Sequence, residues 1–142
     1  MKRLVSIAVC FITIISIAIT NINAKTTTVY YGFYGSETTV FKKKGNKLTV
    51  KVRSPIDYYK KNRLFTGKTK GKKKTFKLSK KIKYYSAEVD NHMRLYNPKS
   101  VKKGSLKKIK NSIKDAQNDY RECYIILVVK NGVASKILAC CS

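Results

Sequence analysis

The C-terminal stretch "YRECYIILVVKNGVASKILACC" constrains the fold most, because it places two apolar runs on either side of Asn131-Gly132. Asn-Gly is the preferred pair for a type I′ turn, since both residues tolerate positive φ and the twist of this turn matches that of paired strands. The sequence therefore predicts a C-terminal hairpin with a two-residue loop, in which Lys130 lies opposite Val133.

The same register places Cys123 directly opposite Cys140, at a non-hydrogen-bonded position where paired side chains approach most closely. We expect these two cysteines to form a disulfide, which an oxidising compartment would permit. Cys141 is then left over. Three alternatives are open for this residue. It is a free or capped thiol near the terminus, or it forms an intermolecular disulfide that joins two copies into a dimer, or it forms a vicinal bond with Cys140.

The N-terminus has the pattern of a secretory leader. Lys2 and Arg3 precede an apolar run over residues 4–20, and Ile22-Asn23-Ala24 follows as a small-residue cleavage site. We expect residues 1–24 to be a signal peptide and residues 25–142 to form a single basic β-rich domain, secreted or associated with the cell envelope. An uncleaved membrane anchor is the alternative, because the apolar run reaches the short limit for a spanning helix.

The pattern between the leader and the C-terminal hairpin is rich in strands. Gly45-Asn46 predicts a second hairpin, and Leu48, Val50 and Val52 alternate with polar residues as expected for a strand with one buried face. Gly67 and Gly71 indicate an exposed connection. Further strands are expected at residues 26–34, 38–41, 74–78 and 82–89.

One amphipathic helix is expected over about residues 105–118. Ser105 can act as its N-cap, and apolar residues recur at spacings of three and four from Leu106 to Ala116. Lysines 107, 108, 110 and 114 lie off this stripe, on a solvated face or, alternatively, on a membrane surface. The expected fold class is therefore β-rich α+β, a small antiparallel barrel or sandwich with this helix and a C-terminal hairpin.

The sequence contains three tyrosine doublets, at Tyr30-Tyr31, Tyr58-Tyr59 and Tyr84-Tyr85. Neighbours in a strand point to opposite faces, so in a strand we expect one member of a doublet to enter the core and the other to stay exposed. The other members, beside lysines, would suit stacking on a sugar or on single-stranded nucleic acid.

The chain offers few groups for catalysis. His92 is the sole histidine, which excludes two-histidine hydrolysis and sites that need several histidine ligands. Glu88, Asp90 and His92 would share one face of an extended strand, but this polar stretch is more typical of a solvated turn. The sequence also has no Gly-rich phosphate loop, paired CxxC or nucleophile elbow. We therefore expect no enzyme, no metal site and no cofactor.

Positive charge is the main functional signal, with a formal net charge of +25. Lysine predominates over arginine, and lysine acts as a hydrated point charge rather than a directional fork. We expect a secreted, non-enzymatic module that associates by diffuse electrostatics with an anionic polymer or cell surface: cell-wall polymer, acidic glycan or extracellular nucleic acid. The densest run supplies the candidate residues Lys68, Lys70, Lys72, Lys73, Lys74, Lys77, Lys80, Lys81 and Lys83.

Two alternatives belong to other functional classes. The first is a structural or protein-interaction domain whose charge is compositional, and the second is a cationic effector that acts on membranes. In style, an exported lysine-rich β domain with a closing Asn-Gly turn resembles secreted proteins of low-GC Gram-positive bacteria, although it carries no diagnostic motif.

Overall fold

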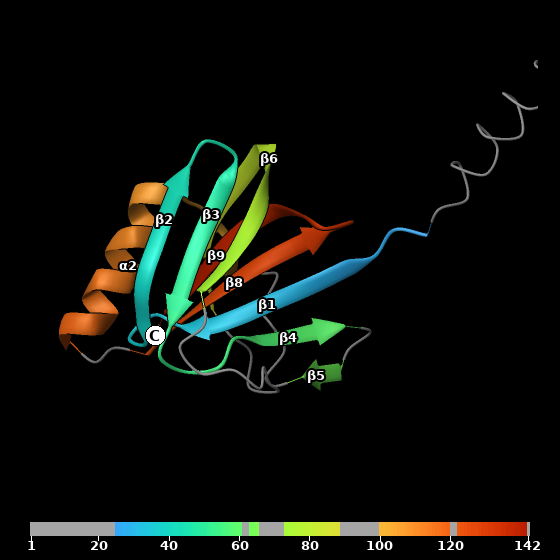
Figure 1. Cartoon of the computed structure of the whole chain (residues 1–142). Helices are drawn as coiled ribbons and strands as arrows, with labels where there is room; N and C mark the ends of the chain where they lie inside the picture. The colour runs from blue at the N-terminus through green and yellow to red at the C-terminus, as the bar shows by residue number, and fades with distance from the viewer. Residues whose placement is uncertain (1–24, 61–62, 66–72, 89–99, 120–121, 142) are drawn as a thin grey trace, which may run out of the picture.

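The computed structural model describes residues 25–60, 63–65, 73–88, 100–119 and 122–141, and the expected leader lies outside them. These residues form one nine-stranded sheet and one helix (Figure 1). In chain order the elements are β1 (Thr28–Tyr34), β2 (Thr38–Lys44), β3 (Lys47–Val52), β4 (Asp57–Lys60), β5 (Arg63–Phe65), β6 (Lys73–Ala87), β7 (Lys102–Lys103), α2 (Leu106–Asp119), β8 (Cys123–Lys130) and β9 (Val133–Cys141).

The sheet is open. Its strand order is β2-β3-β6-β9-β8-β1-β4-β5, with β7 paired to β6 outside this path. Figure 1 shows β2 and β3 crossing in front of β8 and β9, with α2 beside them. The β-rich fold with one helix is as expected, but the described strands form neither a closed barrel nor a second sheet. The helix, rather than another sheet, covers the inner face.

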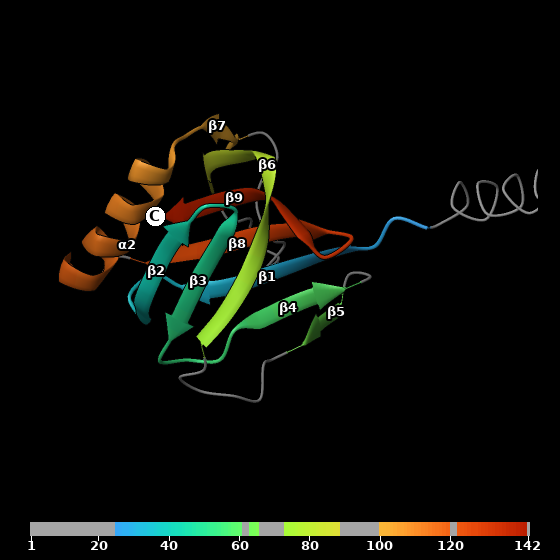
Figure 2. The same ribbon diagram turned by 45° about the horizontal axis from the view of Figure 1, so that its top comes forward.

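Strand β6 joins the two halves of the sheet. The sequence predicted two strands here, whereas Lys73–Ala87 is one continuous strand of 15 residues. Its first part pairs antiparallel with β3 and its later part pairs parallel with β9, with an irregularity between Leu78 and Lys83 (Figure 2). One long strand thus pairs with two different neighbours. The local sequence pattern does not show this continuity.

The main core lies between the inner face of the sheet and α2. Leu48, Val50 and Val52 are all buried there, which confirms the predicted alternation in β3. The doublets of β1 and β6 each place one tyrosine against this core as predicted, but the other tyrosine is also partly buried and is not an open platform for stacking. Tyr31 and Tyr84 pack against this core, while their neighbours Tyr30 and Tyr85 pack against a second apolar cluster on the other face.

The helix begins where its cap was predicted. The backbone N–H of Lys108 donates to Ser105 Oγ at 3.2 Å, and Ile109, Ile113 and Ala116 form the buried stripe. An N-cap serine satisfies one of the free N–H groups of the first turn.

Substitution Ser105→Ala is therefore expected to lower the free energy of unfolding by about 1 kcal/mol, measured by urea denaturation. Ser112→Ala is the matched control, because the same exchange inside α2 favours the helix through its propensity. Equal effects of the two substitutions would show that the cap does not contribute.

The register of β8 and β9 changes along their length. Lys130 pairs with Val133 across Asn131-Gly132, where both turn residues have positive φ, but the pairing shifts between Val128 and Val129. The extra residue in β9 is Ser135, whose Oγ donates to the Val128 carbonyl at 3.2 Å. A bulge of this kind places two residues of one strand opposite one residue of the other.

This shift overturns the predicted cysteine pairing. Cys123 lies opposite Cys141 and forms a disulfide with it, while Cys140 is buried and takes no part in the disulfide. A slip of one residue turns every following side chain to the opposite face, which explains why Cys140 lies in the second apolar cluster. Cys141 is thus not the unpaired cysteine that was expected to link two copies into a dimer.

Candidate polyanion-binding surface

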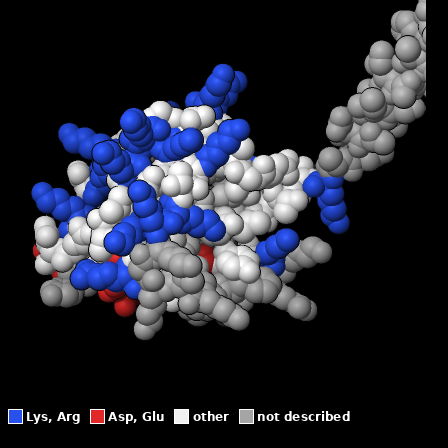
Figure 3. Space-filling model, viewed as in Figure 1, with Lys and Arg blue, Asp and Glu red and all other residues white. Residues whose placement is uncertain are grey.

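Six lysines share the outer face of the three-stranded layer β2–β3–β6, which we call the lysine grid. Its members are Lys42, Lys44, Lys47, Lys51, Lys73 and Lys77, and all six are exposed. Figure 3 shows Lys and Arg side chains gathered over the area that β2, β3 and β6 occupy in Figure 1.

Strand alternation explains why these lysines face outward. The apolar residues of β3, which alternate along the strand, are buried. Lys47 and Lys51 occupy the other set of alternate positions, so they point to the opposite face. Residues opposite each other on neighbouring strands share a face, so the register of β3 with β2 and β6 extends this surface to both neighbours.

Several lysines of the grid lie directly opposite one another. Lys47 pairs with Lys44 on one side and with Lys77 on the other. Lys51 pairs with Lys73. Like charges directly opposite each other destabilise a sheet, so these pairs reduce stability unless something else neutralises them.

Two threonines occupy the middle of the grid. Thr49 and Thr75 are paired across β3 and β6, and their hydroxyl oxygens lie 3.3 Å apart. The lysines therefore surround a small polar centre. The surface offers no bulky apolar side chain at this point.

The spacing of the grid makes its charges act together. Neighbouring strands lie about 4.8 Å apart, and alternate residues along one strand lie about 6.6 Å apart. Both spacings are shorter than the Debye length of about 8 Å at physiological salt. The positive potentials of the six ammonium groups therefore reinforce one another.

The strands that carry this surface contain no acidic residue. None of the seven Asp and Glu residues belongs to β2, β3 or β6. Just beyond the end of β3, Arg53 Nε and Glu37 Oε2 form an ion pair at 3.6 Å that includes no lysine of the grid. Both side chains are exposed, so this pair contributes little stability.

The lysines predicted from the densest run do not form one surface. Lys73 and Lys77 belong to the grid. Lys74 faces the opposite side, where its Nζ lies 4.0 Å from the centre of the Tyr31 ring in a cation–π contact.

The rest of that predicted set lies elsewhere. Lys80, Lys81 and Lys83 are exposed on β6 beyond its pairing with β3, and Lys83 lies opposite Lys136 of β9. Lys68, Lys70 and Lys72 fall outside the described residues. Lysines that are close in the sequence therefore lie on different surfaces of the fold.

Sequence reasoning missed the lysines that β2 and β3 contribute. Lys42, Lys44, Lys47 and Lys51 alternate with residues of the opposite face in "VFKKKGNKLTVKV". That alternation was visible and indicated a solvated face. It did not reveal that β6 would bring Lys73 and Lys77 beside it.

Other lysines cover the outer side of the helix. Lys107, Lys108, Lys110 and Lys114 are all exposed and lie off the buried stripe of α2, as predicted. By contrast, β1 contains no lysine. Among the described residues, the grid and α2 thus carry two groups of exposed lysines, and further lysines lie on β6, β7, β8 and β9.

A group of aromatic side chains lies on the other side of the molecule. The rings of Tyr34 and Tyr124 meet edge to face at 5.1 Å, and a side chain at Gly32 would collide with the Tyr124 ring. Burial, together with the nearby Asp57 carboxylate, raises the pKa of Tyr124 well above its ordinary value. This phenol therefore stays protonated at neutral pH.

The candidate metal or base cluster is only partly visible. Glu88 is exposed and its backbone N–H donates to Ser100 Oγ at 2.7 Å, whereas Asp90 and His92 lie outside the described residues. The residues that the structure does describe contain no group of three potential metal ligands. They also contain no helix that is long and apolar enough to cross a membrane.

Comparison with known proteins gives no family for the chain: no family model matches it, and no curated protein or solved structure is significantly similar.

Proposed function

We propose that this protein is a non-enzymatic module that binds an anionic polymer through the lysine grid. Export by the expected leader would place it outside the cell, where cell-wall polymers, acidic glycans and released nucleic acid are the available polyanions. Lysine point charges favour attraction to a line of negative charges without reading its sequence.

The observation that supports this proposal is the direct opposition of lysines across three strands. Lys44, Lys47 and Lys77 form one row, and Lys51 and Lys73 form another. Such rows reduce the stability of the free protein. A bound polyanion would remove this repulsion and release its own counterions, so binding and relief of repulsion act in the same direction.

The test is the salt dependence of binding to labelled polyanions, with a random-sequence DNA duplex and a heparin oligosaccharide as probes. If each of the six lysines neutralises one phosphate of the duplex, log K falls against log salt with a slope of about −5. Affinity then decreases roughly a thousandfold between about 50 and about 200 mM salt. We expect binding to persist at physiological salt.

Two results would contradict the proposal. Release of both probes well below physiological salt would favour a protein-interaction domain whose charge is compositional. Leakage of anionic lipid vesicles at concentrations where neither polymer binds would favour the membrane-active effector.

A further inference from the structure

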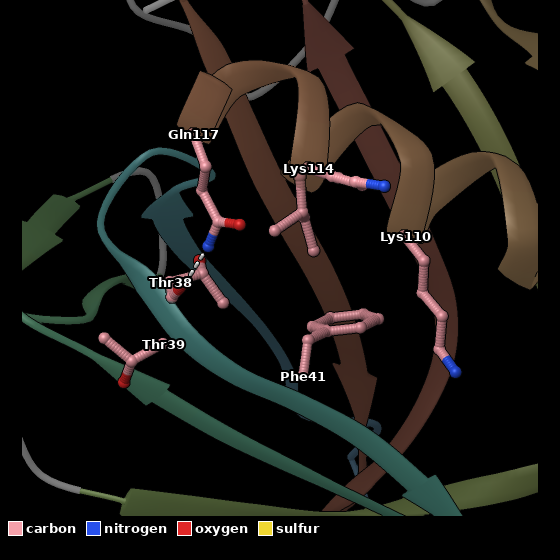
Figure 4. Close-up of a pocket in the computed structure, with 7 residues that line it drawn as sticks. Thr38, Thr39, Phe41, Lys110, Lys114 and Gln117 are labelled. Carbon is pink, nitrogen blue, oxygen red and sulfur yellow. Dashed lines mark hydrogen bonds between the residues drawn. The ribbon is translucent and has the colours of Figure 1, made fainter.

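A pocket of about 220 Å³ lies between the edge strand β2 and the helix α2 (Figure 4). Its floor is apolar, formed by Phe41 and Ile113. Polar and charged groups complete the lining: Thr38 and Thr39 from the strand, and Lys110, Lys114 and Gln117 from the helix. The pocket is separate from the lysine grid, because Phe41 faces the core side of β2.

Two lysines bring positive charge to this pocket. Lys110 and Lys114 are four residues apart in α2, so they lie on the same side of the helix. Like charges at this spacing destabilise a helix. No ion pair joins either lysine to another described residue, so a negatively charged group in the pocket would meet two uncompensated ammonium groups.

The two threonine hydroxyls have their only donor engaged, and Gln117 has one of its two N–H donors engaged. Thr38 Oγ1 donates to the Tyr34 carbonyl at 2.9 Å, and Thr39 Oγ1 donates to the Lys51 carbonyl at 3.2 Å. The Gln117 amide nitrogen donates to the Thr38 carbonyl, as Figure 4 shows, which fixes the orientation of that side chain. The hydroxyl lone pairs and the amide oxygen therefore act as acceptors.

These features define the chemistry of a ligand. Acceptors select a molecule with hydroxyl donors, the two ammonium groups select an anion, and the Phe41 ring offers an apolar surface to C–H groups. The volume equals that of roughly seven waters at about 30 Å³ each and lies below the range of about 300 to 1,000 Å³ typical of larger ligands. One ring-sized group fits these limits.

We infer that the pocket between β2 and α2 binds an acidic sugar, a single pyranose unit that carries a carboxylate or a phosphate. A sugar has hydroxyl donors around its rim and an apolar C–H face, which matches the acceptors and the Phe41 ring. This site does not depend on the lysine grid, since the two share no residue.

The test is a titration of the isotope-labelled protein at low salt, followed by NMR, with glucuronate and glucose 6-phosphate as the two probes. We expect amide shifts at residues 38–41 and 110–117 and little change at Thr49 and Thr75 of the grid. The comparison of the two probes distinguishes carboxylate from phosphate. Glucose, acetate and inorganic phosphate are the controls and should bind at least about tenfold more weakly.

A second lysine pair supplies a matched comparison. Lys110→Gln with Lys114→Gln should weaken the preferred sugar acid about tenfold or more. By contrast, Lys102→Gln with Lys103→Gln removes the same charge from exposed side chains of β7, which does not line the pocket, and should change the affinity less than about twofold. Phe41→Leu keeps an apolar floor but removes the ring, and should also weaken binding.

Three outcomes would overturn the inference. Acetate or phosphate binding as tightly as the sugar acids would mean attraction of any anion, and shifts confined to the grid would place binding elsewhere. Equal losses in the two lysine pairs would show a general charge effect. Binding of polymers by the grid is measured separately, so each idea can fail alone.

Discussion

Glutamine at four positions of the lysine grid is expected to lower the affinity for a DNA duplex at least about a hundredfold at low salt. The positions are Lys47, Lys51, Lys73 and Lys77, which form the β3–β6 part of the grid. Each lost phosphate contact reduces the salt slope by about 0.9, so the slope should become shallower by about 3 to 4. Fluorescence anisotropy over a series of salt concentrations measures both quantities.

A matched variant carries the same change of charge elsewhere. Glutamine at Lys102, Lys103, Lys107 and Lys108 also removes four positive charges, and all four side chains are exposed outside β2, β3 and β6. At about 0.1 M salt this variant should lose less than about fivefold in affinity, because charges farther away than about 10 Å are then largely screened. Equal losses in the two variants would mean that net charge alone attracts the polymer.

Arginine at the four grid positions tests the nature of the attraction. Arginine keeps the charge but replaces a point charge by a planar fork. If attraction is diffuse, affinity should stay within about threefold of the original protein. A large loss would instead indicate that the surface recognises a particular geometry.

The glutamine variant of the grid should also be more stable than the original protein. Removing opposed lysines such as Lys47 with Lys77 relieves repulsion worth roughly 0.2 to 1 kcal/mol per pair. The gain should be largest at low salt, where screening is weakest. A surface that improves folding when it is neutralised, yet loses binding, is what a binding role requires.

The second large effect concerns the disulfide. Substitution Cys141→Ser is expected to lower the free energy of unfolding by about 3 kcal/mol, measured by chemical denaturation without reductant. The disulfide joins residues 18 apart in the sequence and restricts the unfolded chain by closing that loop. Cys123→Ser should have an effect of similar size.

Cys140→Ala is the matched control for this experiment. It removes a buried thiol and leaves the disulfide in place, so it should cost only on the order of 1 kcal/mol. Burial raises the pKa of the Cys140 thiol to about 12, so at pH 8 only about one molecule in ten thousand carries the thiolate. Cys140 should therefore resist alkylation in the folded protein and react after denaturation.

Peptide mapping decides between the two registers of β8 and β9. Tryptic cleavage leaves Cys140 and Cys141 in the same C-terminal peptide, so the variants are needed to separate them. The link to the Cys123 peptide should persist in Cys140→Ala and disappear in Cys141→Ser. The reverse result would restore the pairing predicted from the sequence and would remove the bulge at Ser135.

Elements that depend on near neighbours could be predicted. The turn at Gly45-Asn46 joins β2 and β3 as expected, and Ser105 caps a helix that runs over Leu106–Asp119. Turn chemistry, capping and the periods of 2 and 3.6 act over a few residues, so the chain shows them directly. The core positions of β3 follow from the same alternation.

Elements that depend on distant partners could not be predicted. The continuity of β6 follows from its having β3 as one neighbour and β9 as the other. The lysine grid likewise forms only when three strands pair in register. Only two of its six members lie in the lysine-rich run 68–83 from which the binding residues were predicted. Pairing between strands far apart in the chain leaves no local pattern.

The amino-acid sequence by itself determined a strongly cationic β-rich chain, the main turns, the capped helix and the division of the tyrosine doublets of β1 and β6 between opposite faces. Turn preference, side-chain alternation and net charge are local or additive properties. The tertiary structure alone decided which cysteine closes the disulfide and which lysines meet on one face. The extra residue Ser135 shifts the register of β9 and thereby determines the disulfide. The pairing of β3 with β6 determines which lysines share a face, because register fixes the face of every side chain.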